Sequence, residues 1–414
     1  MAESLALYVH FPFCLSICPY CDFDRQATGF DRIDVYLGAV ERELASCAAR
    51  GARVHSIFFG GGTPSLMTPR QVAELIDAAR VAFEVLPDAE VTLECNPGDA
   101  DLQKLRGFKA AGANRLSFGI QSLDDHFLQQ LGRRHTSAEA RRAASWAHEA
   151  GFNFNLDFMF GLPGQSLAQW QRTLEAAVGL GPNHLSCYLL TLDERVPMGR
   201  EVARGRLVLP EDDTLAAMYA ATREQLAAAG YEQYEISNWA RPGYSSRHNL
   251  TYWRDGAWLG VGAGAASSCN GRRWKNTPLL ERYIASITDG GRALRVEDEQ
   301  PDLLAQMVDH LSLGLRLREG VSRDSFAARF GCDLGEALGD DGAWLAAQGF
   351  LEWPDSRLRI ADEHQFITNE ILVRLEERLA AYVRRDTSAS QIAARYALAG
   401  SRADASSSAS SARR

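Results

Sequence analysis

Over the first 235 residues, short apolar runs alternate with stretches whose apolar residues recur at helical spacing. The strand-like runs are LALYVHF (5–11), VHSIFFGG (54–61), EVTLECNP (90–97), NRLSFGIQS (114–122), NFNLDFMFGLP (153–163) and HLSCYLLTL (184–192). The helical stretches between them include TPRQVAELIDAARVAF (68–83), AEARRAASWAHEAG (138–151) and SLAQWQRTLEAAVGLG (166–181). A repeated strand-then-helix order predicts a parallel sheet with crossover helices.

One helix start is specified in detail by its residues. Thr68 is a favourable N-cap, Pro69 suits the first helical position, and Gln71 completes a capping box. The segment GGGTPSLM at 60–67 is therefore predicted to be the loop that leaves a strand before this helix.

Several polar or reactive residues follow the predicted strands at their carboxyl ends, where parallel α/β sheets bind ligands. We therefore expect these residues to share one site: the cysteines of the 14–21 cluster, Gly60 to Pro64, Glu94, Gln121 and Asp157.

The second half of the chain changes character. Residues 236–290 are rich in Gly, Trp, Tyr and Ser and show no long helical period, so we expect an irregular segment that lines a cavity or covers the mouth of a barrel. In residues 300–380, two predicted helices precede the hairpin pattern FLEWPDSRLRI (350–360) and a further helix, which is typical of a winged-helix-like α+β domain. The predicted division is 1–235, 236–298, 299–382 and a tail, 383–414, expected to be disordered.

Net charge and composition argue against nucleic-acid binding and against a membrane-spanning protein. The net charge of −9 and the absence of a basic stripe in the winged-helix-like segment argue against nucleic-acid binding. No apolar run is long enough to cross a bilayer, and MAESLALYVHFPFC resembles no secretory signal. We expect a cytoplasmic protein.

Three of the eight cysteines, Cys14, Cys18 and Cys21, lie within eight positions. A structural zinc site takes four protein ligands, and a fourth here would have to be distant or be His10. A four-iron cluster held by three thiolates would instead keep one iron open for a small molecule. The spacing favours the cluster and leaves the zinc site as an alternative.

The motif CLSICPYC (14–21) resembles the signature of radical S-adenosylmethionine (SAM) proteins, and GGGTP (60–64) resembles their glycine motif. The resemblance implies an incomplete parallel (β/α) barrel, a [4Fe–4S] cluster on the three cysteines and SAM at the open iron. It also implies a set of SAM-pocket residues: Tyr8, Tyr20, Gly61, Gly62, Thr63, Glu94, Gln121, Arg133 and Asp157. Strand-end hydrogen bonding for the acids and a surface position for Arg133 remain alternatives.

Further motifs narrow the resemblance to the oxygen-independent coproporphyrinogen III oxidase-like proteins, and within these to the heme chaperone group. They include YVHFPFC, ECNPG, RLSFGIQSLDD, LGRRHT, YEISNWARPGYSSRHNLTYW and GVGAGAASS. The oxidase carries a cysteine two positions after the third cluster ligand, whereas this chain has Phe23. The chaperone group has an HNxxYW motif, matched here by HNLTYW (248–253).

The resemblance therefore implies a chaperone that binds heme and passes it to an acceptor protein, with radical SAM oxidative decarboxylation of coproporphyrinogen III as the alternative. His248 is the candidate heme ligand, with Cys187, Cys269, His10 and the methionines as rival donors. The expected partners are heme, an acceptor protein, an electron donor such as a flavodoxin or ferredoxin, and a membrane surface met transiently through the acceptor.

Overall fold

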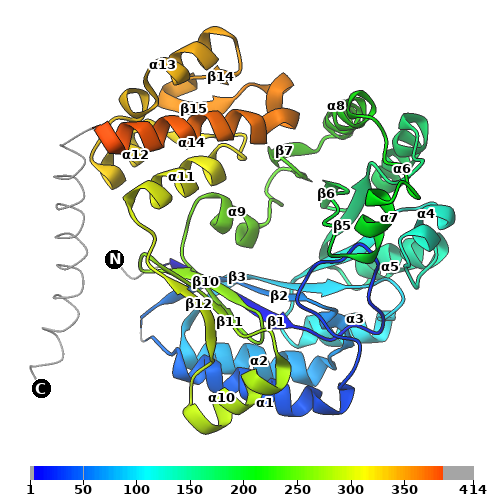
Figure 1. Cartoon of the computed structure of the whole chain (residues 1–414). Helices are drawn as coiled ribbons and strands as arrows, with labels where there is room; N and C mark the ends of the chain where they lie inside the picture. The colour runs from blue at the N-terminus through cyan, green and yellow to red at the C-terminus, as the bar shows by residue number, and fades with distance from the viewer. Residues whose placement is uncertain (1–3, 50, 386–414) are drawn as a thin grey trace, which may run out of the picture. The chain divides into compact units, whose positions relative to one another are not determined.

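The computed structural model describes residues 4–49 and 51–385, which form two compact units (Figure 1). The first unit contains the chain up to Tyr252 together with Gly256–Glu299, and the second contains Trp253–Asp255 and the chain from Gln300 onward. Because the second unit takes its first residues from the end of a helix that begins in the first, the chain passes between the two units three times, after Tyr252, Asp255 and Glu299.

The first unit is built on one twelve-stranded sheet. Its strands are β1 (Ser4–Phe11), β2 (Arg53–Gly61), β3 (Glu84–Cys95), β4 (Arg115–Gln121), β5 (Asn153–Phe160), β6 (His184–Leu189), β7 (Glu232–Glu235), β8 (Asn238–Ala240), β9 (Trp258–Val261), β10 (Ala266–Cys269), β11 (Arg272–Asn276) and β12 (Arg295–Glu299). The strand order is β12-β11-β10-β9-β1-β2-β3-β4-β5-β6-β8-β7, and the seven strands from β9 to β6 run parallel.

Helices follow the parallel strands as predicted. They are α1 (Ile33–Ser46), α2 (Pro69–Ala82), α3 (Leu102–Ala110), α4 (Asp125–Gln130), α5 (Ser137–Glu149), α6 (Leu167–Gly179), α7 (Pro197–Ala203), α8 (Asp212–Ala228), α9 (Arg247–Trp253) and α10 (Leu280–Gly290). The start of α2 confirms its capping box, because the Thr68 side chain accepts from the Gln71 amide and the Gln71 side chain from the Thr68 amide. Helices α1 and α2 lie along the outer face of β1, β2 and β3 (Figure 1).

Successive residues of the parallel strands point to opposite faces of the sheet. One face carries buried apolar side chains that form the core with the helices, including Leu7 and Val9 of β1, Phe59 of β2 and Leu93 of β3. The other face is mostly polar and lines the interior of the curved sheet.

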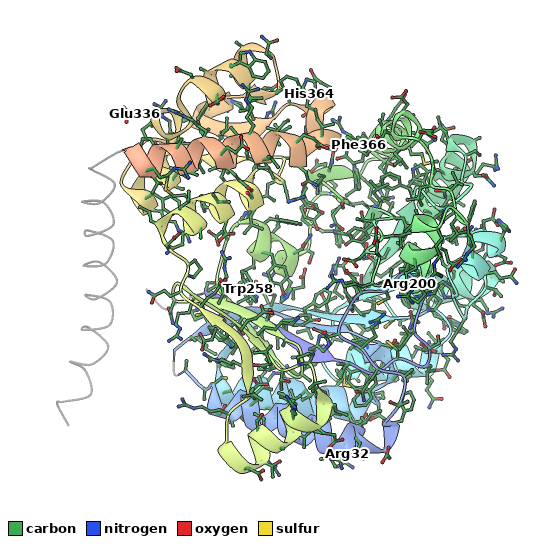
Figure 2. The ribbon with its side chains drawn as sticks, viewed as in Figure 1. Arg32, Arg200, Trp258, Glu336, His364 and Phe366 are labelled. Carbon is green, nitrogen blue, oxygen red and sulfur yellow. The ribbon has the colours of Figure 1, made fainter. Side chains whose placement is uncertain are left out.

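The expectation of an irregular segment over 236–290 is wrong. These residues form α9, α10 and four strands, with β9 pairing in parallel with β1 and the β10–β11 hairpin continuing the sheet. Helix α10 lies beside α1, and Glu281 pairs with Arg32, labelled in Figure 2, at 2.9 Å. Short strands with many glycines lack the run length by which strands are predicted, and their partners lie far away in sequence.

The second unit contains α11 (Leu303–Gly314), β13 (Val321–Ser322), α12 (Arg323–Phe330), α13 (Leu334–Ala347), β14 (Leu351–Glu352), β15 (Arg357–Ile360) and α14 (Thr368–Arg385). Strands β14 and β15 form the predicted antiparallel hairpin, and β13 adds a third strand. This arrangement of four helices and three strands is winged-helix-like, with three helices before the hairpin where the sequence pattern predicted two.

Of the predicted disordered tail 383–414, residues up to Arg385 complete α14, and the remainder lies outside the described residues. Within the part of the chain that the structure describes, no helix has the length and apolar character needed to cross a bilayer.

Candidate functional site

The loop that carries the three cysteines is held by backbone hydrogen bonds at the carboxyl end of β1. The Cys14 amide donates to the Gln26 carbonyl (2.9 Å), and the Gln26 amide donates to the Pro12 carbonyl (2.8 Å). The Thr63 amide donates to the Phe13 carbonyl (2.9 Å), which joins the loop to the end of β2. The loop therefore has its own scaffold, independent of any metal.

All eight cysteines are free thiols in the structure, and the three in this loop are partly exposed. Thr63 Oγ1 donates to Cys14 Sγ (3.6 Å), and Arg133 Nη1 donates to Cys18 Sγ (3.6 Å). Burial raises the pKa values of the Cys14 and Cys21 thiols. Donors already aimed at the sulfurs are what bound thiolates require, so the donor set fits an iron–sulfur cluster.

No three His, Cys, Asp or Glu side chains within residues 4–49 and 51–385 converge closely enough to hold a single metal ion. A structural zinc ion needs four sulfur or imidazole donors around it, and the described side chains do not supply such a set.

The glycines of GGGTP are required by packing against the cysteine loop. Gly61 has a φ of +109°, and a Cβ there would lie 2.4 Å from the His10 ring. A Cβ on Gly62 would lie 2.7 Å from the Phe13 carbonyl oxygen. Only glycine lets the end of β2 approach β1 and the cysteine loop this closely.

Arg133 joins several predicted site residues. Its Nη2 donates to Asn96 Oδ1 (2.5 Å) and to the Gly119 carbonyl (2.6 Å), while its Nη1 reaches Cys18. Arg133 Nε is buried with no hydrogen-bond partner among the described residues. Arg133 is thus a part of the candidate site, and one of its donors is free for a ligand.

Tyr20 and Gln121 adjoin Arg133. Burial raises the pKa of the Tyr20 phenol, whose neighbours are Arg133 and Cys18. Gln121 adopts a left-handed backbone with φ of 64°, which is uncommon outside glycine and typical of functional sites.

The two predicted acids lie on the polar face of the sheet. Glu94 Oε2 accepts from the Gly61 amide (3.1 Å), and burial, with Asp157 nearby, raises the pKa of Glu94 to about 8. Asp157 accepts from Ser117 Oγ (3.0 Å) and Asn155 Nδ2 (2.7 Å), and burial raises its pKa. A bound cation such as an ammonium would favour the ionised form of both.

Tyr8 stands next to these acids. Its hydroxyl is joined to His10 Nδ1 (3.1 Å), and His10 Nε2 donates to the Asp24 carbonyl (2.8 Å). Because Nε2 carries the proton, Nδ1 accepts from the Tyr8 hydroxyl. His10 is therefore fully engaged within the protein, and burial lowers its pKa.

Several residues of the polar face were not among the predicted site residues. All but Asn96, which directly follows β3, occupy every second position on a strand, so period-two polar alternation within apolar runs was the available signal. The missed residues are Ser56, Thr92, Asn96, Arg115, Ser117, Asn155, His184 and Ser186.

The polar interior is partly exposed near the carboxyl ends of its strands. Tyr8, Glu94 and Asp157, near the carboxyl ends of their strands, are partly exposed, and Tyr188 is 42% exposed. Ser56 and Arg115, near the amino ends, are buried. The interior therefore opens at the carboxyl ends, where the cysteine loop lies.

His248 lies beside Tyr8, with the ring centroids 6.4 Å apart. Its side chain is 1% exposed, Nδ1 is joined to Ser56 Oγ (3.0 Å), and Nε2 is joined to Tyr252 OH (2.8 Å). The ring packs on Phe58, with centroids 5.0 Å apart, and burial lowers the pKa of His248 to about 3. The imidazole is neutral, but both of its nitrogens are occupied.

Glu90 holds the start of α9 against the sheet. Its carboxylate accepts from Ser246 Oγ (3.1 Å), the Arg247 amide (3.1 Å) and the His248 amide (3.0 Å). The start of the HNLTYW motif therefore packs against the sheet in this structure.

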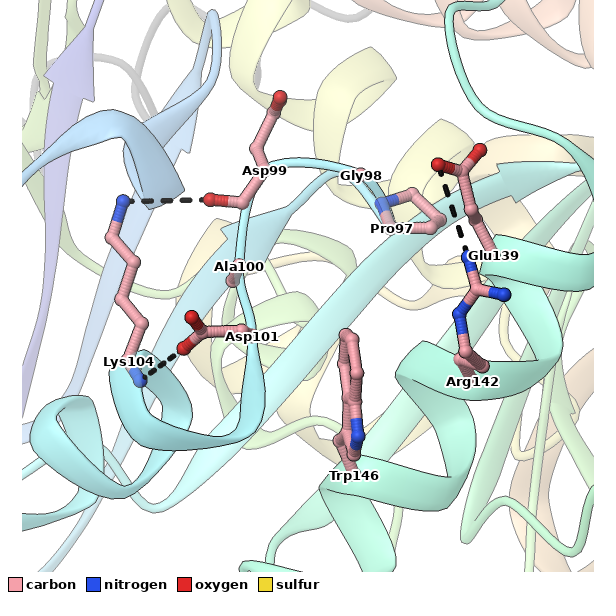
Figure 3. Close-up of a pocket in the computed structure, with 9 residues that line it drawn as sticks. All are labelled: Pro97, Gly98, Asp99, Ala100, Asp101, Lys104, Glu139, Arg142 and Trp146. Atoms are coloured by element: carbon pink, nitrogen blue, oxygen red, sulfur yellow. Dashed lines mark hydrogen bonds and ion pairs between the residues drawn. The ribbon is translucent and has the colours of Figure 1, made fainter.

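A separate pocket of about 270 Å³ lies outside the strand interior, between the loop after β3 and helices α3 and α5 (Figure 3). Lys104 Nζ donates to the Asp99 backbone carbonyl (3.4 Å), and Arg142 pairs with Glu139 (4.0 Å). None of the predicted site residues lines it.

Comparison with known proteins agrees with this geometry. The sequence matches the Radical SAM superfamily over residues 8–177 and the HemN C-terminal domain over residues 302–366. Among solved structures, Escherichia coli coproporphyrinogen III oxidase (HemN), a radical SAM enzyme, superposes with a TM-score of 0.78 at 22% identity, covering 91% of this chain and 90% of that one. This likeness confirms the predicted radical SAM fold.

Two relatives are more similar in sequence. The heme chaperone HemW of Escherichia coli (strain K12) is 42% identical over 386 residues, covering 89% of this chain and 97% of that protein. HemW of Bacillus subtilis (strain 168) is 35% identical over 368 residues, covering 88% and 97%. The chain therefore belongs to the radical SAM superfamily and, within it, to the family of the heme chaperone HemW.

Proposed function

We propose that this chain is a radical SAM heme chaperone, which binds heme and transfers it to an acceptor protein. The observation that carries the proposal is the 42% identity to Escherichia coli HemW over nearly the whole of that protein. The cysteine loop, the glycine motif and the polar interior are the parts of the chain that such a protein needs for its cluster and SAM.

In the proposed holoprotein, Cys14, Cys18 and Cys21 hold the [4Fe–4S] cluster, with Thr63 and Arg133 donating to two of the sulfurs. The bound cluster and SAM together supply one-electron chemistry. We assign the SAM pocket to residues around the open end of the interior: Tyr8, Tyr20, Gly61, Gly62, Thr63, Glu94, Gln121, Arg133 and Asp157.

The chemistry of these side chains suits SAM. Glu94 and Asp157 can take the ammonium and ribose hydroxyls, and the free Nε of Arg133 can donate to the carboxylate. In taking up the ammonium, Glu94 gives up the proton that its raised pKa lets it hold at neutral pH.

His248 is the proposed heme ligand. Its low pKa keeps the imidazole neutral, as iron ligation requires. From the position seen here, Nε2 must first give up its hydrogen bond to Tyr252, or Nδ1 its bond to Ser56. Ligation by His248 therefore implies that the start of α9 moves.

Heme titration of wild type beside His248→Ala tests both parts of the proposal. We expect a shifted Soret band in wild type and an altered band position or weaker affinity in His248→Ala. No Soret shift in wild type would reject the chaperone function. An unchanged spectrum in His248→Ala would clear His248 and leave the other donors.

An activity assay separates the chaperone from the oxidase alternative. Reconstituted protein with SAM, reductant and coproporphyrinogen III should give no protoporphyrinogen, because Phe23 stands where the oxidase carries a cysteine. Formation of protoporphyrinogen would establish the oxidase activity instead.

The wider setting follows from the same proposal. We infer a cytoplasmic location, because none of the eight cysteines forms a disulfide, which is typical of a reducing compartment. A flavodoxin or ferredoxin would supply the electron, and the acceptor would bring the protein transiently to a membrane surface.

A further inference from the structure

Arg115, on β4, is a buried charge that makes no hydrogen bond or ion pair with any described residue, and Glu94 and Asp157 attract it only at longer range. Its side chain is 2% exposed, and its Nε has no hydrogen bond. An unpaired buried charge is costly to the fold, so a partner is expected.

Two neighbours at the same level of the sheet are also unsatisfied. Arg115 is in register with Thr92 of β3 on one side and with Asn153 of β5 on the other. Thr92 Oγ1 and Asn153 Oδ1 are both buried without a hydrogen-bond partner. Three adjacent strands thus present three unsatisfied polar groups to one point of the interior.

The nearby acids do not complete this site. Glu94 bonds to the Gly61 amide, and Asp157 bonds to Ser117 and Asn155, so both carboxylates are held above Arg115 without contact. Burial raises the pKa of Glu94 to about 8, which leaves it largely uncharged at neutral pH.

The groups on the amino side of Arg115 do not pair with it either. The pKa of His184 is well below its ordinary value because of burial, and burial raises that of the Tyr234 phenol. Glu90 is occupied by the start of α9.

We propose that Arg115, Thr92 and Asn153 form a binding site for a carboxylate group that enters from the open end of the interior. The guanidinium fork matches the two oxygens of a carboxylate, and the Thr92 hydroxyl can donate to one of them. The Asn153 amide presents its NH₂ after a half-turn about its last torsion. Resting on the proposed function, two ligands can bring this group: heme with its propionates, or SAM with its single carboxylate, which would then bind Arg115 in place of Arg133.

Paired ligands that differ only in the carboxylate test the site in the full-length protein. The first pair is heme and heme dimethyl ester, measured by optical titration. The second is SAM and decarboxylated SAM, measured by calorimetry. In one of the two pairs, we expect the ligand without the free carboxylate to bind wild type about tenfold more weakly than its parent ligand. Loss of a charge-assisted hydrogen bond predicts a difference of this size.

Arg115→Met should abolish the affinity difference between the two ligands of that pair, because methionine fills the space but donates no hydrogen bond. Arg115→Lys should restore part of it, and Thr92→Val should reduce it. Arg106→Met, at an exposed arginine of α3 paired with Glu149, is the matched control and should leave it unchanged. Thermal melts of each variant, ligand-free, identify any loss of folding.

The ligand pair whose affinity difference disappears in Arg115→Met identifies the source of the carboxylate. If both differences persist in folded Arg115→Met, or if neither exists in wild type, the proposal is overturned and water alone fills the site. If neither heme nor its ester binds while SAM does, the chaperone function fails, but the SAM pair still decides the carboxylate site.

Discussion

At the residue scale, the interior is built from groups whose ionisation is controlled by burial. Glu94 and Asp157 lie in the same enclosed space, and burial raises the pKa of each. Among the residues that the structure describes, Glu94 accepts one hydrogen bond, from the Gly61 amide. A carboxyl group in this setting holds its proton at neutral pH until a cation arrives.

Glu94 should therefore make the ligand-free protein less stable as the pH rises. Its pKa is about 8 in the folded protein against an ordinary value of 4.5. Below pH 4.5 both states hold the proton, and the contribution to stability is complete. Between the two pKa values only the folded state holds it, so stability falls as the pH rises through this range.

Thermal melts of wild type and Glu94→Gln from pH 5 to 8 measure this effect. The melting temperature of wild type should fall by a few degrees relative to that of the variant. A constant difference between the two across this range would contradict the raised pKa.

At the element scale, β1, the cysteine loop and the end of β2 act as one unit. The Gly62 amide donates to the Phe11 carbonyl (2.7 Å), and the Thr63 amide donates to the Phe13 carbonyl. Any side chain on Gly62 would separate these segments.

Gly62→Ala should destabilise the protein by about 1–3 kcal/mol, because the added methyl group overpacks against backbone that cannot move aside. Because the displaced segment carries Cys14, the iron content after reconstitution should fall as well. Chemical denaturation and iron and sulfide analysis measure the two effects.

Gly38→Ala in α1 is the matched control, since a Cβ there meets nothing within 4 Å. It should be neutral or slightly stabilising, as alanine is in a helix. Equal effects of both substitutions would contradict the packing role of Gly62.

At the scale of the whole molecule, the cluster is an addition to a fold that is complete without it. The cysteine loop is tied by its own backbone bonds, and the large sheet has an apolar core against its helices. This differs from small zinc domains, whose metal supplies the folding free energy.

Removal of the cluster by oxidation and chelation should therefore leave the far-UV circular dichroism spectrum unchanged and lower the melting temperature by only a few degrees. The visible absorption of the cluster should disappear at the same time. Loss of secondary structure on chelation would instead support the structural-metal alternative.

The local pattern was sufficient for the parallel strands and for the helix at Thr68, because side-chain period and capping are properties of neighbouring residues. It also identified Cys14, Cys18 and Cys21 as a group, since a loop brings close positions together. The segment 236–290 was assigned wrongly because its short strands exist only by pairing with β1 and with one another.

What the sequence determined by itself was thus the class of fold, the cysteine cluster and the family motifs, all of which reside in short runs of residues. Only the tertiary structure decided that the His248 imidazole is buried and doubly bonded, and that Thr92, Arg115 and Asn153 meet. These two features depend on strand register and on the order of strands in the sheet. Contacts between residues far apart in sequence set both, so no short run of residues predicts them.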